Sequence, residues 1–113
     1  MTATIKGIIP VMLTPFTEAN AIDYAGLEKL IEWYIANGAD ALFAVAQSSE
    51  MQFLSLDERI ALARFVVQKA AGRVPVIASG HVSESRGDQV TELTSIAKTG
   101  VDGLVLVTNR FDP

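Results

Sequence analysis

The sequence contains no cysteine, and its 113 residues include one histidine, His81. Without cysteine there can be no disulfides, thiolate zinc sites, iron–sulfur clusters or thiol nucleophile. A single histidine cannot form a histidine-rich metal centre, and a Ser–His–Asp triad would have to be built around His81. These absences exclude most metal and thiol chemistry, and nothing indicates an oxidising compartment.

Long apolar runs and clusters of basic residues are also missing. The longest purely apolar run, residues 41–46, is far shorter than the ~18 residues that cross a bilayer, and the N-terminus lacks the regions of a signal peptide. Nine basic residues against 13 acidic ones give a net charge of −4, and the basic residues are scattered. We therefore expect a cytoplasmic protein that binds neither nucleic acid nor a membrane.

The remaining composition is that of a globular domain. Half of the residues are hydrophobic and 19% are charged, which supplies enough apolar side chains for a core. Glycine-led segments recur at residues 38–46, 72–78 and 100–108, and each continues into an apolar run. A repeat of roughly 30 residues suits one helix and one strand per unit, so the sequence predicts a βα repeat.

Three helices are expected between these apolar runs, and their ends carry recognisable signals. The predicted helices cover residues 24–37, 56–71 and 86–99. Asp23 and Ser85 are suitable N-caps, Ser55 and Glu58 form a capping-box pattern, and Gly38 follows the first helix.

Apolar residues at helical spacing predict which helix faces are buried. On the first helix they are Leu27, Leu30, Ile31, Tyr34 and Ile35, and on the third we expect Val90, Leu93, Ile96 and Ala97 to face inward.

The predicted strands are continuous apolar runs without polar alternation, which is typical of parallel strands. They cover residues 7–13, 41–46, 74–79 and 103–108. The strand-to-helix loops carry most of the unusual polar residues: Thr14, 47–50, 79–81 and 108–110. Because these loops meet at the carboxyl ends of parallel strands, we expect them to form the functional site.

The segment Gln47-Ser48-Ser49-Glu50 follows a buried strand directly. Its hydroxyls and backbone N–H groups could bind a small carboxylate, or it could be an ordinary turn that satisfies its own amides. Glu50 is expected to be a structural acceptor rather than a general base.

Two other polar loops allow both functional and structural interpretations. His81 could shuttle protons, but a lone histidine in a loop is more often structural. Asn109 and Arg110 could bind an anionic substrate or form a surface ion pair or oligomer contact. Residues 79–81 lack the spacing of a phosphate-binding loop, so a nucleotide site has little support.

At these residues the sequence resembles a known family. The segments 7–16, 38–50 and 74–78 are similar to the N-terminal part of the dihydrodipicolinate synthase and N-acetylneuraminate lyase family, and the similarity extends over essentially the whole chain. The resemblance implies a (β/α)₈ TIM barrel and a pyruvate-dependent class I aldolase or lyase without metal or organic cofactor. Residues 1–113 would then be the incomplete N-terminal half of that barrel domain.

The resemblance also suggests which residues meet the substrate. The family's Gly-Thr/Ser-Thr-Gly-Glu motif, which binds the pyruvate carboxylate, corresponds to residues 46–50. Ser48 keeps its second hydroxyl and is the expected catalytic residue. Gln47 replaces the first hydroxyl and Ser49 replaces a glycine, and both are expected to bind substrate.

Arg110 and Phe111 are the other expected substrate-binding residues, and they stand where the family commonly has two tyrosines. Phe111 lacks the phenol that would relay a proton. The family's Schiff-base lysine lies on a later strand, and no lysine of this sequence follows the carboxyl end of a predicted strand.

The function predicted is therefore that of a fragment of a Schiff-base-forming lyase or aldolase. The complete enzyme would act on pyruvate or a related 2-oxo acid, with the lysine outside this chain, as a cytoplasmic homo-oligomer, dimer or tetramer. The alternative is a small flavodoxin-like α/β binding or interaction domain without catalytic activity.

Overall fold

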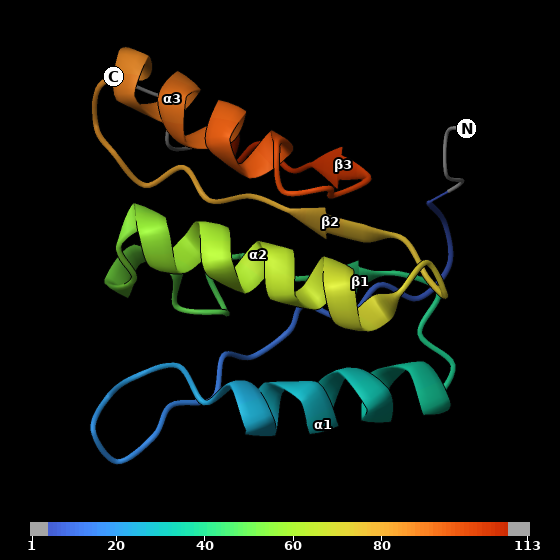
Figure 1. Ribbon diagram of the computed structural model, residues 1–113. Coiled ribbons are helices and arrows are strands. Elements are labelled where there is room, and N and C mark those ends of the chain that lie inside the picture. Colours follow the sequence, from blue (N-terminus) through green and yellow to red (C-terminus); the bar gives the residue numbers. More distant parts are fainter. Residues whose placement is uncertain (1–4, 109–113) are drawn as a thin grey trace.

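The computed structural model describes residues 5–108 and contains alternating helices and parallel strands (Figure 1). The elements in chain order are α1 Tyr24–Ala36, β1 Leu42–Phe43, the 3₁₀ turn η1 Met51–Phe53, α2 Leu56–Ala70, β2 Val76–Ala78, α3 Arg86–Ala97 and β3 Gly103–Leu104. The three expected helices are confirmed to within about two residues at each end. The strands are shorter than expected but lie inside the predicted runs.

The strands form a parallel sheet in the order β1-β2-β3. In its register Phe43 pairs with Ile77, and Ile77 pairs with Gly103. The order follows the sequence, so each helix connects two neighbouring parallel strands. This is the arrangement of successive units in a (β/α)₈ barrel.

The run expected to be the first strand, residues 7–13, is reduced to one bridge between Val11 and Phe43. Phe43 donates its N–H to the Pro10 carbonyl, and Met12 donates to the Phe43 carbonyl. The segment therefore lies beside β1 as predicted. Pro10 has no N–H to extend a ladder, and the Ile8 N–H binds the Asp40 carboxylate instead.

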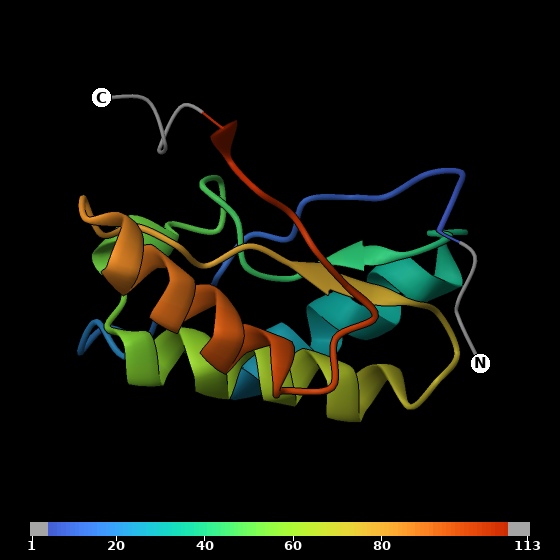
Figure 2. The ribbon, with the colours of Figure 1, turned by 90° about the horizontal axis from the view of Figure 1, so that it is seen from above.

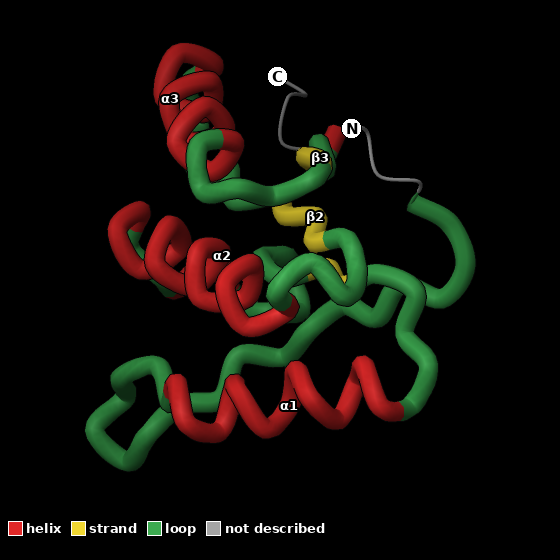
Figure 3. The backbone as a smooth tube through the Cα atoms, turned by 45° about the vertical axis from the view of Figure 1, so that its right-hand side comes forward, coloured by secondary structure: helices red, strands yellow, loops and turns green. Residues whose placement is uncertain are grey.

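All three helices lie on one face of the sheet, as Figures 2 and 3 show. A doubly wound flavodoxin-like domain would have helices on both faces. Strand-segment side chains such as Ile8, Leu13 and Leu106 are 53–71% exposed, so they have no covering layer here. The one-sided layer supports the barrel prediction over the flavodoxin-like alternative.

The helix ends follow the sequence signals. The Asp23 carboxylate accepts the Gly26 N–H, and the Ser55 hydroxyl and Glu58 carboxylate form a complete capping box at α2. Ser85 caps α3 by accepting the Asp88 N–H. Gly38 has φ +91°, the left-handed conformation that glycine supplies at a helix C-terminus.

The predicted buried face of α3 is wrong in part. Val90 is 55% exposed and Ala97 is exposed, whereas Gln89, Glu92 and Ile96 are the buried residues of the helix. An apolar stripe usually marks the inner face, but here two polar side chains have buried partners that make their burial favourable. The helix is therefore rotated relative to the orientation that hydrophobicity predicts.

Candidate functional site

The strand-to-helix loops meet at the carboxyl ends of the strands, as predicted. Thr14 contacts Ser49, the Ser79 N–H donates to the Val45 carbonyl, and His81 contacts Val107. Residues far apart in sequence are thus neighbours at one rim of the sheet. The predicted site residues Arg110 and Phe111, with Asn109, lie outside the described residues.

The turn after β1 presents two of the predicted site residues to solvent. Gln47 and Ser48 are exposed. The Ser49 and Met51 N–H groups both bind the Ala46 carbonyl, and this closes the turn. Within residues 5–108, neither the backbone N–H groups of Gln47 and Ser48 nor the Ser48 hydroxyl have a hydrogen-bond partner. These three groups are hydrogen-bond donors that no described residue satisfies.

Ser49 has a different environment from its neighbours. Its side chain is fully buried, and its hydroxyl donates to the Met12 carbonyl. The Thr14 hydroxyl in turn donates to the Ser49 carbonyl at 2.7 Å. Ser49 was expected to bind substrate, but its hydroxyl is used to attach the turn to the first segment of the chain.

Glu50 ends the turn in the left-handed conformation, with φ 64° and ψ 34°, and precedes η1. Its side chain is exposed, and within the described part of the chain its carboxylate accepts no hydrogen bond. The expected role as a structural acceptor is therefore not seen among these residues.

His81 is completely buried, and both ring nitrogens are engaged. Nε2 accepts the Val107 N–H at 2.9 Å, so this nitrogen carries no proton. Nδ1 therefore carries the proton of the neutral ring and donates it to Gln89 Oε1 at 2.6 Å. The structural interpretation of His81 is the one that this geometry supports.

A buried ion pair lies beside His81. Arg59 Nη1 is 2.5 Å from Glu92 Oε2, and both side chains are about 95% buried. Burial alone would raise the pKa of Glu92, but hydrogen bonds from Arg59 and from Ser83 outweigh it and hold that pKa below its usual value. Glu92 is therefore a buried carboxylate in its charged form.

The sequence pattern did not predict a role for Arg59, Gln89 or Glu92. Each lies on an amphipathic helix, where a charged or amide residue normally predicts a solvent-facing position. The only sequence signal for them is weak. Gln89, Glu92 and Ile96 are spaced so that they share one helical face, and this face could have been predicted as the buried one. Only their partners on other elements distinguish this face from an exposed one.

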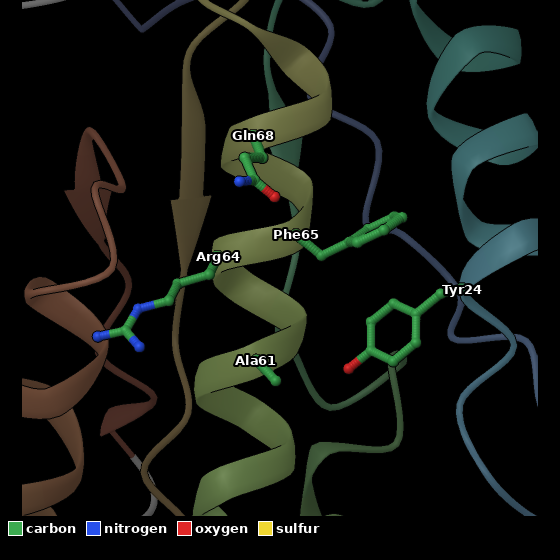
Figure 4. A pocket seen from close by; sticks show the side chains of 5 residues that line it. All are labelled: Tyr24, Ala61, Arg64, Phe65 and Gln68. Atoms are coloured by element: carbon green, nitrogen blue, oxygen red, sulfur yellow. The ribbon is translucent and has the colours of Figure 1, made fainter.

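A concave region lies in the helix layer, and no rim residue lines it. It is a hollow of about 440 Å³ lined by Tyr24, Ala61, Arg64, Phe65 and Gln68, all from α1 and α2 (Figure 4). The rings of Tyr24 and Phe65 contact each other at a tilt of 55° with centroids 4.8 Å apart, whereas Arg64 extends to the other side of α2. Burial and the Glu58 charge raise the pKa of Tyr24. The polar groups that line this hollow do not converge on one point, so we interpret it as a packing hollow between the helices.

No group of three potential metal ligands occurs among the described residues. In the same part of the chain, no helix has the length and apolar character needed to cross a membrane.

Comparison with known proteins identifies the family to which this geometry corresponds. The model of the dihydrodipicolinate synthetase family matches residues 4–111. The 4-hydroxy-tetrahydrodipicolinate synthase of Shewanella denitrificans is 40% identical over 109 residues, which cover 96% of this chain and 36% of that protein. The chain therefore spans about a third of the length of the curated relatives it matches.

Solved structures agree with the sequence match. The dihydrodipicolinate synthase of Acinetobacter baumannii, solved in complex with pyruvate, aligns with a TM-score of 0.84 and 29% identity over 89% of this chain and 34% of its own. A prophage protein of E. coli from the same family, also solved with pyruvate, aligns with a TM-score of 0.81 and 31% identity over 90% of this chain and 34% of its own.

Proposed function

The chain belongs to the dihydrodipicolinate synthetase family, and we propose that residues 1–113 are the N-terminal part of one TIM-barrel domain in a Schiff-base-forming aldolase or lyase. The substrate of the complete protein is pyruvate or a related 2-oxo acid. Two structural relatives bound to pyruvate support this substrate class.

The turn after β1 is the observation that carries the proposal. The N–H groups of Gln47 and Ser48 and the Ser48 hydroxyl, which have no partner within residues 5–108, would provide donors for a carboxylate without adding a fixed positive charge. Every 2-oxo acid has a carboxylate beside its reacting carbonyl, so a carboxylate held at the strand ends places that carbonyl over the barrel mouth. We assign Ser48 and Gln47 to this contact and Ser49 to the support of the turn.

The covalent chemistry belongs to a lysine outside this chain. In the complete enzyme its amine condenses with the substrate carbonyl and releases water. The protonated imine accepts the electron pair when a carbon–carbon bond breaks, and the corresponding enamine donates an electron pair when the bond forms. Lys29 and Lys69 lie on α1 and α2, Lys98 caps the C-terminus of α3, and Lys6 precedes the first strand segment. None of them follows the carboxyl end of a strand.

Gln47 favours a polar substrate. Its amide can both donate to and accept from hydroxyl or carboxyl groups, whereas the hydroxyl common in the family is shorter. Arg110 and Phe111 are the remaining predicted contacts. Arg110 would add an anion-binding group, and Phe111 would add an aromatic ring without the hydroxyl that could relay a proton. We therefore propose that the substrate is a sugar-acid-like or other polar 2-oxo acid. We also propose that the complete enzyme is a cytoplasmic homo-oligomer, either a dimer or a tetramer.

Borohydride trapping tests the proposal. The complete protein, incubated with pyruvate and borohydride, should gain the mass of one reduced pyruvate adduct per chain on a lysine outside residues 1–113. The 113-residue chain, treated identically, should gain none. Failure of the complete protein to form an adduct, or a stoichiometric adduct on Lys6, Lys29, Lys69 or Lys98, would contradict the proposal.

A further inference from the structure

Three consecutive residues in the loop after β2 are each held by a different buried side chain. The Gly80 carbonyl accepts from Arg59 of α2, His81 donates to Gln89 of α3, and the Val82 N–H donates to Glu92 of α3 at 3.2 Å. Gly80 has φ +116°, and a Cβ there would lie 2.8 Å from Ile96, so the backbone passes close to α3. The loop is thus fixed at every residue in this stretch.

The same side chains reach the loops on either side. Arg59 Nε donates to the carbonyls of Leu54 and Ser55, which end the loop after β1, at 3.2 and 3.3 Å. On the other side, His81 accepts the Val107 N–H from the segment after β3. Two buried pairs, Arg59–Glu92 and His81–Gln89, therefore link the three segments that follow β1, β2 and β3.

The connection extends to the carboxylate-binding turn. The Leu54 N–H binds the Met51 carbonyl, and the Met51 N–H binds the carbonyl of Ala46, where the turn begins. Met51 and Leu54 are 1% and 5% exposed, so this link is enclosed. Arg59 holds the far end of the same short loop whose near end presents Gln47 and Ser48.

We propose that Arg59, Glu92, His81 and Gln89 are positioning residues that hold the rim loops in fixed mutual positions, so that the donors of the 47–48 turn are aligned for a 2-oxo acid carboxylate before it binds. This inference rests on the proposed function of that turn. The four residues do not touch the substrate and act through the backbone that they anchor.

The chemistry of the pairs favours positioning over simple stabilisation. A buried ion pair adds little stability because losing hydration costs as much as the attraction gains. The other hydrogen bonds of this ion pair go to the loop backbone. Arg59 donates to three backbone carbonyls, and Glu92 accepts from the N–H groups of Val82 and Ser83. Such contacts fix geometry, and a binding site that is already held in its bound conformation loses less free energy to ordering when its ligand binds.

The substitution Arg59→Lys in the complete protein tests the proposal. Lysine keeps a charge beside Glu92, but its single ammonium cannot reach three carbonyls and the carboxylate together. We expect KM for pyruvate to rise about 10-fold or more, with kcat less affected, and hydrogen exchange to accelerate across residues 46–55. Unchanged KM and unchanged exchange would overturn the proposal.

Arg73→Lys is the matched control. Arg73, at the other end of α2, also binds a carboxylate, that of Glu32, and two carbonyls, those of Ala70 and Lys69, but it is exposed and far along the helix from the rim. This variant should leave KM and exchange near residues 46–55 unchanged. An equal rise in KM would show that the effect of Arg59→Lys is general to such substitutions.

Two measurements on the unsubstituted protein keep the proposal testable if Arg59→Lys does not fold. Nitrogen NMR of the imidazole should show His81 as the neutral Nδ1–H tautomer, and the N–H groups of Val82, Ser83 and Val107 should exchange as slowly as that of Ala44. An Nε2–H tautomer or fast exchange at these loops would overturn it. If borohydride trapping fails in the complete protein, the proposed function fails, while these two readings still report on the rim itself.

Discussion

Thr14 donates its hydroxyl hydrogen to the carbonyl oxygen of Ser49 at 2.7 Å, across 35 residues of sequence. The Ser49 hydroxyl returns a hydrogen bond to the Met12 carbonyl, and all of these groups are buried. The turn that presents Gln47 and Ser48 is therefore tied to the first segment by a reciprocal pair of bonds.

The substitution Thr14→Val removes one of these bonds while keeping the side-chain shape. It leaves the buried Ser49 carbonyl unpaired, which should cost about 1–3 kcal/mol of unfolding free energy in the complete protein. Denaturant titration measures the loss. Thr91→Val is the control, because the Thr91 hydroxyl is exposed and binds only a carbonyl of its own helix. Equal stability of the two variants would mean that the Thr14 bond contributes nothing.

The substitution Ser48→Ala should lower kcat/KM for pyruvate by roughly 10- to 150-fold, the effect of losing a hydrogen bond to a charged group of about 1.5–3 kcal/mol. Stability should not change, because the Ser48 hydroxyl has no partner within residues 5–108. Steady-state kinetics and thermal unfolding separate the two. If kinetics match those of the parent, the turn has only a structural role. Ser95→Ala on α3 serves as the comparison.

Glu92 should make the free energy of unfolding depend on pH in the acid range. Its pKa in the folded protein is lowered, so its contribution is complete above the unfolded value of about 4.3 and is lost as the pH falls through the lower folded value. Glu92→Gln should flatten the acid side of the stability curve and cost about 3 kcal/mol or more near neutral pH, because Arg59 remains charged and buried. Urea titrations between about pH 3 and pH 7 measure both effects. Parallel curves for parent and variant would contradict this.

Glu32→Gln is the control for that experiment. The pKa of Glu32 is also lowered by its hydrogen bond to Arg73, but the pair is exposed to solvent. Solvent screening should make its effect on the acid slope small.

The substitution Ser79→Ala should leave the complete protein equally stable or about 1 kcal/mol more stable. Ser79 is fully buried, and its hydroxyl is the one buried side-chain polar atom of residues 5–108 without a hydrogen-bond partner. Removing an unsatisfied hydroxyl removes its desolvation penalty. Calorimetry measures the change. A destabilisation above about 1 kcal/mol would reveal a partner such as an enclosed water molecule.

The 113-residue chain on its own should self-associate. Ile8, Leu13 and Leu106 are 71%, 60% and 53% exposed, and the β3 edge of the described sheet has no neighbouring strand. Sedimentation velocity should show species larger than a monomer that increase with concentration. A cooperative, stable monomer would instead favour the compact binding-domain alternative.

The sequence by itself determined the elements and their order. Helix limits followed from Asp23, the Ser55–Glu58 capping box and Gly38, because caps and stops depend on residues a few positions apart. Parallel strands followed from uninterrupted apolar runs, and the position of the rim followed from the polar loops between them. These are local properties, so a single sequence contains the information that fixes them.

Tertiary structure decided which polar residues are buried and which face the rim. Ser48 and Ser49 are adjacent and alike in sequence, yet one is exposed and the other is enclosed between Met12 and Thr14. Glu92 is charged and buried because Arg59, 33 residues earlier in the chain, supplies its partner. The free energy of burying a polar group depends on whether a distant group completes its hydrogen bonds, and only the folded chain brings that group into place.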